Sequence, residues 1–213
     1  MKELFDLREE YTKGALIESE VPPTPLPLFE KWFDDAVNEN LPEPNAMVLT
    51  TATQQGMPSS RIVLLKELAK DGFIFFTNYH SRKGKQIEEN PNVAVVFDWH
   101  EAERQVRIEG IAEKISEKDS DTYFNSRPES SKIGAWTSPQ SEELNSRQQI
   151  DELLKKTTET FEGKTIPRPP HWGGYIIRPK YIEFWQGRAN RLHDRIVYKK
   201  DTQGEWKIGR LAP

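Results

Sequence analysis

The sequence of 213 residues predicts a mainly β fold with flanking α-helices (α+β), built on an antiparallel barrel. Two observations lead to this prediction. From residue 46 onward, short segments rich in β-branched and aromatic residues follow one another directly, with Gly or Pro turns between them. Strands that are consecutive in the sequence favour antiparallel pairing, and the amphipathic helical segments then pack outside the barrel.

The strands are expected where apolar and β-branched residues are densest. In sequence order they are 46–53, 59–68, 72–78, 93–100, 104–115, 173–187 and 194–200. Helical spacing and capping residues place the helices between and before them. In sequence order these are 2–13, 28–40, 81–91, 117–127 and 142–161.

The segment "VPPTPLPL", residues 21–28, has four prolines in eight residues and is expected to be an extended, non-helical connector. The helix that follows places Phe29, Trp32 and Ala36 on one apolar stripe, which is typical of a core-facing helix. We expect an N-terminal segment with a Pro-rich connector over 1–27 and a single domain over 28–213.

Composition excludes several classes of protein. The sequence has no run of 18 apolar residues, so no membrane-spanning helix is expected, and its polar N-terminus does not resemble a secretory signal. It contains no cysteine, so disulfides, thiolate nucleophiles and cysteine metal sites are excluded. This composition fits a reducing cytoplasm.

The net charge of −4 is unevenly distributed. Residues 1–45 hold eleven Asp/Glu and four Lys/Arg, roughly −7, which leaves about +3 on the remainder. That balance does not provide the continuous basic face of a nucleic-acid-binding protein. It suits small basic pockets that each hold one or two phosphates.

The first basic segment is "RIVLLK", residues 61–66. Side chains alternate along a strand, so Arg61 and Lys66 are expected on opposite faces unless a bulge intervenes. In that case they would serve different ligands or different ends of one site. A buried strand with solvated ends is the simpler interpretation.

The second segment, "HSRKGKQ", starts a helix that Ser81 can cap. The unpaired amides of a helix start favour anions, whereas Arg82 and Lys83 in the first turn oppose the helix dipole. A bound phosphate would remove that conflict. A solvated helix end is the alternative.

The third segment is "YFNSRPESSKIGAW". Tyr123 and Arg127 are four residues apart and share a helical face. Pro128 is expected to end that helix and to open the next one, which places Ser131 near a new helix start. A phenol, a guanidinium and a hydroxyl that converge on one point can hold a phosphate.

The fourth segment is "FWQGRANRLHDR", residues 184–195. Arg191 and His193 are two residues apart and would project from the same face of a strand, with Asp194 on the other. A neutral imidazole there can orient a substrate or handle a proton. The four histidines (80, 100, 171 and 193) lack a metal-ligand spacing, so no metal site is expected.

Together these segments resemble the pyridoxine/pyridoxamine 5′-phosphate oxidase family over nearly the whole chain. The shared motifs include "RIVLLK", "TNYHSRKGKQIEENP", "ERQVRIEG", "YFNSRPESSKIGAW", "PHWGGYIIRP", "IEFWQG", "RLHDR" and "WKIGRLAP", in the family's order. The resemblance implies a split-barrel fold that binds FMN at the interface of a homodimer. It implies oxidation of pyridoxine or pyridoxamine 5′-phosphate to pyridoxal 5′-phosphate, the last step of that cofactor's biosynthesis and salvage. Dioxygen would be the acceptor, giving hydrogen peroxide, and the amine would also release ammonia.

The resemblance also implies a role for individual residues. The implied FMN contacts are Arg61, Ile62, Val63, Leu64, Leu65, Lys66, Phe76, Thr77, Arg82, Lys83, Gln105, Gln140, Ser141, Trp185 and Arg195. The implied substrate contacts are Lys66, Tyr123, Arg127 and Ser131 at the phosphate, Arg191 and His193 at the ring, and Arg8 and Tyr11 in an N-terminal lid. We expect Arg191 and His193 to be the catalytic pair, acting as positioning groups and not as a covalent nucleophile.

The sequence departs from the family pattern near the N-terminus. Glu9 stands where relatives are often basic, and Glu43 where an aspartate is expected. Ile17 and Glu18 replace a basic pair that some relatives carry, so a secondary product site that depends on that pair is not expected.

Two other functions remain open at this level. One is a split-barrel flavoprotein with another substrate, such as a reductase that uses a nicotinamide donor. The segments around Ser131 and His193 argue against it, because both resemble substrate motifs. The other is a non-catalytic FMN or pyridoxal phosphate binding protein. In such a protein Arg191 and His193 would be expected to be replaced, but both residues are present.

Overall fold

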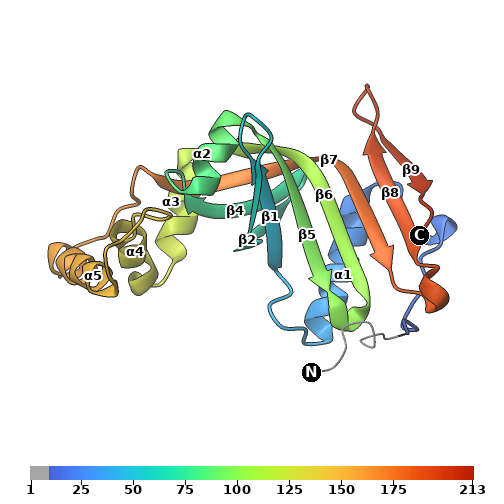
Figure 1. Cartoon of the computed structure of the whole chain (residues 1–213), viewed down its shortest axis with the longest axis horizontal. Coiled ribbons are helices and arrows are strands. Elements are labelled where there is room, and N and C mark those ends of the chain that lie inside the picture. Colours follow the sequence, from blue (N-terminus) through green and yellow to red (C-terminus); the bar gives the residue numbers. More distant parts are fainter. Residues whose placement is uncertain (1–9) are drawn as a thin grey trace.

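The computed structural model describes residues 10–213. Its centre is a nine-stranded antiparallel sheet that curls on itself (Figure 1). The strands are β1 (Ala46–Ala52), β2 (Pro58–Leu64), β3 (Glu67–Ala69), β4 (Gly72–Asn78), β5 (Asn92–Trp99), β6 (Arg104–Lys114), β7 (Trp172–Gln186), β8 (Asp194–Lys200) and β9 (Trp206–Arg210). The α-helices are α1 (Pro25–Asn38), α2 (Arg82–Glu89), α3 (Glu117–Ser126), α4 (Glu129–Thr137) and α5 (Arg147–Phe161). The predicted α+β split barrel is confirmed.

The strand β7 is what splits the barrel. One of its edges pairs with β6 along most of its length, from Gln186 back to Tyr175. Its other edge pairs first with β4, at residues 172–177, and then with β8, at residues 181–186. The strand therefore joins two parts of the molecule, and Figure 1 shows it running from the helices α3–α5 to the hairpin β8–β9.

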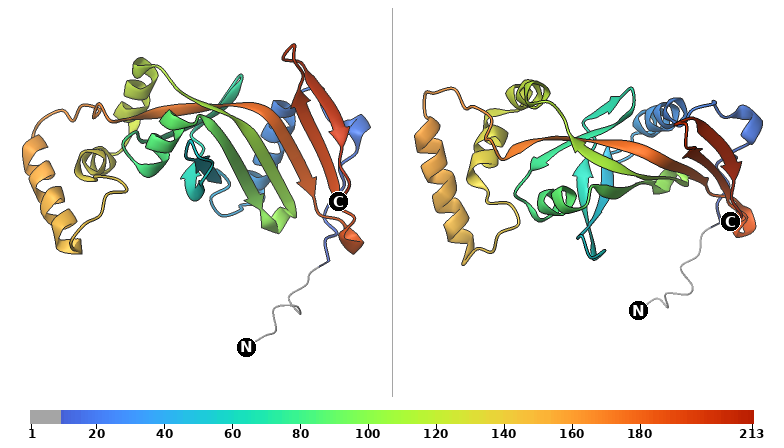
Figure 2. Two further views of the ribbon diagram at one scale, coloured as in Figure 1. Left: turned by 45° about the horizontal axis from the view of Figure 1, so that its top comes forward. Right: turned by 90° about the horizontal axis from the view of Figure 1, so that it is seen from above.

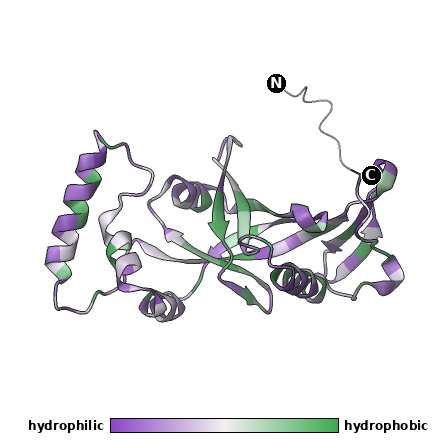
Figure 3. Ribbon diagram, turned by 90° about the horizontal axis from the view of Figure 1, so that it is seen from below, coloured by the Kyte–Doolittle hydropathy of each residue, from purple (hydrophilic) through white to green (hydrophobic). Residues whose placement is uncertain are grey.

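The core lies between the curled sheet and α1. Phe29 of α1 packs edge-on against Phe73 and Phe97, with ring centroids 4.9 and 5.0 Å apart, and Trp32 meets Phe184 at 5.2 Å. Figure 3 shows apolar residues gathered along the strands. The expected core-facing stripe of this helix is confirmed.

The helices at the other end of the molecule are less buried. Helix α5 has no buried residue and packs against α4, and Figure 2 shows it as the element farthest from the hairpin β8–β9. In the part of the chain that is described, no helix has the length and apolar character needed to cross a membrane.

Two local predictions were wrong, and one strand was missed. The connector is helical from Pro25, because proline is tolerated in the first turn of a helix, where the amides have no intrahelical partner. The segment 59–68 forms β2 and β3 with a break at Leu65–Lys66. The strand β9 was not predicted. Most of the expected helix 2–13 lies outside the described residues, and residues 10–13 are not helical.

Candidate active site

A cavity of about 810 Å³ lies between β2, β4, α2 and the α3–α4 pair. This volume is within the range of roughly 300–1,000 Å³ that is common for small-molecule and cofactor sites. Most of the predicted flavin and substrate-phosphate residues line it. They are Arg61, Ile62, Val63, Leu64, Lys66, Phe76, Thr77, Arg82, Lys83, Tyr123, Arg127, Ser131, Gln140 and Ser141.

The expectation that Arg61 and Lys66 face different sides was wrong. Strand β2 ends at Leu64, so the alternation of side chains stops before Lys66, and both cations line the same cavity. The backbone amide of Lys66 donates a hydrogen bond to the carbonyl of Ile74, and this bond holds Lys66 beside β4. Within the segment 61–66, Leu65 does not line the cavity, because its side chain is buried in the core.

The charge of the cavity is one-sided. Five cationic side chains line it (Arg61, Lys66, Arg82, Lys83 and Arg127), and within residues 10–213 no carboxylate lines it with them. Burial lowers the pKa of Arg61, Lys83 and Arg127, because a charged group loses solvation there. A bound anion would offset that loss. The cavity is therefore suited to ligands that carry phosphate groups.

Helix α2 begins at this cavity, as predicted. The hydroxyl of Ser81 caps it by accepting from the amide of Gly84 at 3.3 Å. The Lys83 side chain is 8% exposed, and its Nζ donates to Thr77 Oγ1 at 3.0 Å and to Gln140 Oε1 at 3.2 Å. Burial, and then the neighbouring Arg61, lower the pKa of Lys83 to about 8.

The guanidinium of Arg61 is held in a fixed position. It donates to Thr51 Oγ1 at 2.7 Å and to Ser59 Oγ at 2.6 Å. Both hydroxyls in turn donate to Gln86 Oε1 of α2, at 2.6 and 2.7 Å. This network joins β1, β2 and α2, and it orients the guanidinium before any ligand arrives.

The other end of the cavity is aromatic. The ring of Tyr123 stacks on Phe76 with centroids 3.8 Å apart, and the guanidinium of Arg127 lies 4.5 Å from the ring centroid of Trp172. The Nη1 atom of Arg127 is buried without a hydrogen-bond partner among the described residues. A buried guanidinium donor left unpaired is costly, so this atom indicates that a ligand acceptor belongs beside it.

The remaining predicted flavin contacts lie at the far end of β7. Gln105, Trp185 and Arg195 are directly paired across β6, β7 and β8, so they form one row on one face of the sheet. Trp172 lines the cavity and Trp185 lies thirteen residues further along the same strand, about 40 Å measured along the strand at 3.3 Å per residue. No single small ligand can contact both ends of β7 within one chain.

Arg191 and His193 lie beside this row, but not in a strand as predicted. Residues 189–191 form a 3-10 turn, and β8 begins only at Asp194. Asn190 and Arg191 both have positive φ, 56° and 59°, which is uncommon for residues other than glycine and is often found at functional sites. The side chain of Arg191 is exposed.

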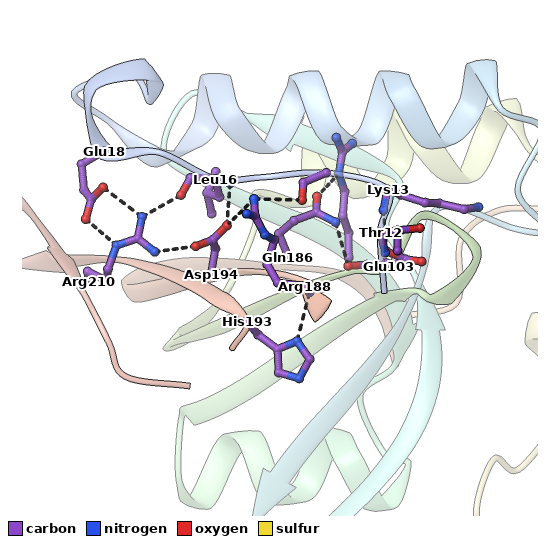
Figure 4. A network of polar contacts seen from close by, with 12 residues as sticks. Thr12, Lys13, Leu16, Glu18, Glu103, Gln186, Arg188, His193, Asp194 and Arg210 are labelled. Carbon is purple, nitrogen blue, oxygen red and sulfur yellow. Dashed lines mark hydrogen bonds and ion pairs between the residues drawn. The ribbon is translucent and has the colours of Figure 1, made fainter. Parts of the chain in front are cut away.

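The ring of His193 has a defined environment. Its centroid lies 4.6 Å from that of Trp185 and 5.6 Å from that of Tyr11. Its Nδ1 accepts from the backbone amide of Arg188 at 3.1 Å, so in the neutral ring the proton lies on Nε2. As predicted, Asp194 points the other way (Figure 4). Arg8 lies outside the described residues, as does Glu9.

Two residues that support the site were not predicted from the sequence. Glu183 is 1% exposed and accepts from Arg195 Nε at 2.7 Å and Arg107 Nη1 at 3.1 Å. Burial alone would raise the pKa of Glu183, but the bonds from Arg195 and Tyr181 lower it. An acidic residue inside an apolar strand was the available signal. Gln86 gave no comparable signal.

Comparisons with known proteins identify relatives of the whole chain. Residues 33–159 match the profile described as pyridoxamine 5′-phosphate oxidase, and residues 172–213 match the pyridoxine 5′-phosphate oxidase C-terminal dimerisation region. A pyridoxine/pyridoxamine 5′-phosphate oxidase of Polynucleobacter asymbioticus is 54% identical over 213 residues, covering 100% of both chains.

Solved structures give the same result for the fold. PhzG of Burkholderia lata, determined with tetrahydrophenazine-1-carboxylic acid, is 31% identical with a TM-score of 0.87, covering 93% of this chain and 98% of that one. An FMN-binding protein of Nostoc punctiforme, related to pyridoxamine 5′-phosphate oxidase, is 16% identical with a TM-score of 0.71, covering 91% of this chain and 100% of that one. With its profile matches and its full-length relative, this chain belongs to the pyridoxamine 5′-phosphate oxidase family.

Proposed function

We propose that this protein is an FMN-dependent oxidase that converts pyridoxine 5′-phosphate or pyridoxamine 5′-phosphate to pyridoxal 5′-phosphate. The observation that carries the proposal is the cavity with five cations and no lining carboxylate among the described residues. FMN and the substrate each bring one phosphate, so two anionic groups would share these cations. The unpaired Nη1 of Arg127 would gain its acceptor from the substrate phosphate.

The residues fit FMN in two places. Arg61, Arg82 and Lys83 would hold its phosphate at the start of α2, where backbone amides add to the positive potential. Lys66, Tyr123, Arg127 and Ser131 would be left for the phosphate of the substrate. Gln105, Trp185 and Arg195 would contact the flavin from the far end of β7.

This second contact requires a partner copy of the chain. The two groups of residues lie at opposite ends of β7, and the family's dimerisation region, residues 172–213, includes Trp185, Arg191 and His193. In a two-fold dimer, the far end of one subunit can meet the cavity of the other. The protein works as a homodimer in which each site takes residues from both chains.

The protein supplies orientation and electrostatics to the reaction. FMN, when bound, supplies a hydride acceptor for the carbon being oxidised, and dioxygen takes up the electrons to give hydrogen peroxide. Arg191 would hold the pyridine ring in a reactive position, and His193 would donate a hydrogen bond from Nε2. The cations of the cavity would stabilise negative charge as it develops.

The test uses protein purified and loaded with FMN, in air. Pyridoxine 5′-phosphate and pyridoxamine 5′-phosphate are added separately, and pyridoxal 5′-phosphate and hydrogen peroxide are followed together. Equal amounts of both products support the proposal. A flavin-loaded protein that forms neither product from either substrate would overturn it.

A comparison compound separates this function from others. Tetrahydrophenazine-1-carboxylic acid, the ligand of the Burkholderia lata protein, has a carboxylate and no phosphate. Turnover of that compound in preference to the two phosphates would contradict the assignment of Arg127. Flavin reduction by a nicotinamide donor without turnover of the phosphates would favour the reductase alternative.

A further inference from the structure

The N-terminal strap, which we define as residues 10–18, lies along the ends of β6, β7 and β8 (Figure 4). It is bound there by hydrogen bonds at several points. Leu16 donates its amide to Asp194 Oδ2 at 3.0 Å, and its carbonyl accepts from Arg210 Nη2 at 2.7 Å. Arg210 also pairs with Glu18. These contacts fix the C-terminal half of the strap.

The N-terminal half is held by one carboxylate. The backbone amides of Thr12 and Lys13 both donate to Glu103 Oε2, at 2.8 and 2.9 Å. The side chain of Lys13 reaches the carbonyl of Glu101 in the same turn. Two consecutive amides on one oxygen form a local anion site, so this carboxylate both attracts and orients the strap.

Glu103 is itself held in an unusual conformation. Its backbone has φ 55° and ψ 36°, in the left-handed region that non-glycine residues seldom adopt. Its carbonyl accepts from the amide of Gly187 at 2.8 Å and from Gln186 Nε2 at 3.1 Å. The main chain is thus tied to the end of β7 while the carboxylate meets the strap.

The strap carries Tyr11 to the predicted substrate ring site. The ring of Tyr11 lies edge-on to Trp185, with centroids 5.6 Å apart, and at the same distance from His193. A Cβ added at Gly187 would lie 2.7 Å from Cγ of Tyr11, closer than real Cβ contacts. Gly187 has no positive φ, so the glycine leaves space for the tyrosine ring.

We propose that Glu103 is a positioning residue that acts through Tyr11. It latches the strap at Thr12 and Lys13, and so places the tyrosine ring against Trp185 and His193. This inference rests on the proposed function, because Tyr11 matters to turnover only if the substrate ring binds there. The latch itself is a property of the chain and can be tested without turnover.

The test without turnover is limited proteolysis by trypsin of the full-length protein. Cleavage after Lys13 requires the strap to leave its place, so Glu103→Ala should form the new N-terminus at Gly14 several-fold faster than wild type. Glu101→Ala is the matched control, since it removes a carboxylate from the same turn and keeps the carbonyl that Lys13 contacts. Equal rates for Glu103→Ala and wild type would overturn the latch.

The test with turnover is a double-mutant cycle. Glu103→Ala should lower kcat/KM about tenfold, the scale of one lost charge-assisted hydrogen bond, and leave the dissociation constant of FMN unchanged. In a Tyr11→Ala background the same substitution should change kcat/KM less than about twofold, because the two residues act as one unit. Additive losses would show a general structural role and would contradict the proposal.

A substitution at Gly187 tests the same contact by steric hindrance. Gly187→Ala keeps the amide that donates to the Glu103 carbonyl but places a methyl group against Tyr11 and against Cβ of Glu103, so it should reproduce the kinetic loss of Glu103→Ala. Gly209→Ala is its control, because a Cβ there meets its nearest neighbour at an ordinary 3.6 Å. Wild-type kinetics for Gly187→Ala would overturn the proposal. If the wild type itself has no oxidase activity, the proposed function fails, and the proteolysis result alone decides the latch.

Discussion

The cavity beside α2 and the far end of β7 are both rich in arginine, but they hold that charge differently. In the cavity, Arg61 and Lys83 bond to neutral oxygens. At the far end, Arg195 pairs with the buried Glu183, and Arg188 approaches Asp194 at 3.5 Å.

This difference assigns the two regions different tasks. Unneutralised cations attract anions, so the cavity is suited to hold the phosphates of a cofactor and a substrate. Cations that are already paired with a carboxylate attract an anion only weakly. The far end of β7 instead presents aromatic rings and oriented hydrogen-bond donors. Arg191 is exposed there, which fits a group that contacts a ring. Four experiments test this division of work.

Loss of Arg191 should have the largest effect. Arg191→Ala should lower turnover by about 100-fold or more, because the substrate ring loses its orientation, while yellow FMN stays bound. Steady-state kinetics and the flavin absorbance of the purified variant measure the two properties. Arg147→Ala on the exposed surface of α5 is the control, and near-wild-type turnover for Arg191→Ala would refute the assigned role.

Mixing two impaired variants should restore part of the activity. Arg127→Ala damages the cavity and Arg191→Ala damages the far end, so a mixed dimer keeps one site with both residues intact. Co-expression with random pairing should recover about a quarter of wild-type turnover at low substrate concentration. Recovery no greater than the mean of the two variants would show that each site lies within one chain.

Two substitutions within the cavity should separate its phosphate sites. Lys83→Ala should weaken FMN binding about tenfold or more, the scale of a lost charge-assisted hydrogen bond, and raise the substrate KM less. Arg127→Ala should show the opposite ranking. Flavin fluorescence titration gives the dissociation constant of FMN, and a reversed ranking would exchange the two assignments.

The smallest expected effect is a dependence on pH. The pKa of Lys83 is lowered to about 8, so above pH 8 the free cavity loses that charge. The affinity for FMN or inorganic phosphate should then fall, by up to about tenfold per pH unit, because binding takes up a proton. This dependence of ligand affinity on pH should be absent in Lys83→Ala. The free energy of unfolding of the ligand-free protein should change with pH in the opposite direction. Between pH 8 and 10.5 the unfolded chain binds more protons at Lys83 than the folded protein does, so stability rises with pH.

Local patterns predicted most elements of the fold. The apolar run of β4 and the Ser81 cap of α2 lie where the sequence placed them. The helical turn at Pro25 was missed because a proline-rich pattern does not distinguish an extended connector from a first helical turn. The short β9 lacks a clear alternation, and its pairing with β8 depends on contacts distant in sequence.

The site was less predictable than the fold. The motif order indicated which residues belong to it, but no periodicity could show that Arg127 and Arg191 lie at opposite ends of one strand. The turn at Asn190 and Arg191 has left-handed backbone without glycine, which sequence propensity disfavours. The Glu103 contact joins residues 91 positions apart, so it required the folded structure.

Strand β7 fixes a distance within the molecule as well as forming part of the sheet. It sets the distance between the place where one subunit would receive the phosphates and the place where it would complete its partner's site. A residue inserted in its middle would turn every later side chain to the opposite face, and two would move the row of Trp185 by about 7 Å. We therefore expect length variation among natural relatives to fall in the 138–146 loop and the β8–β9 turn, and β7 to keep its length.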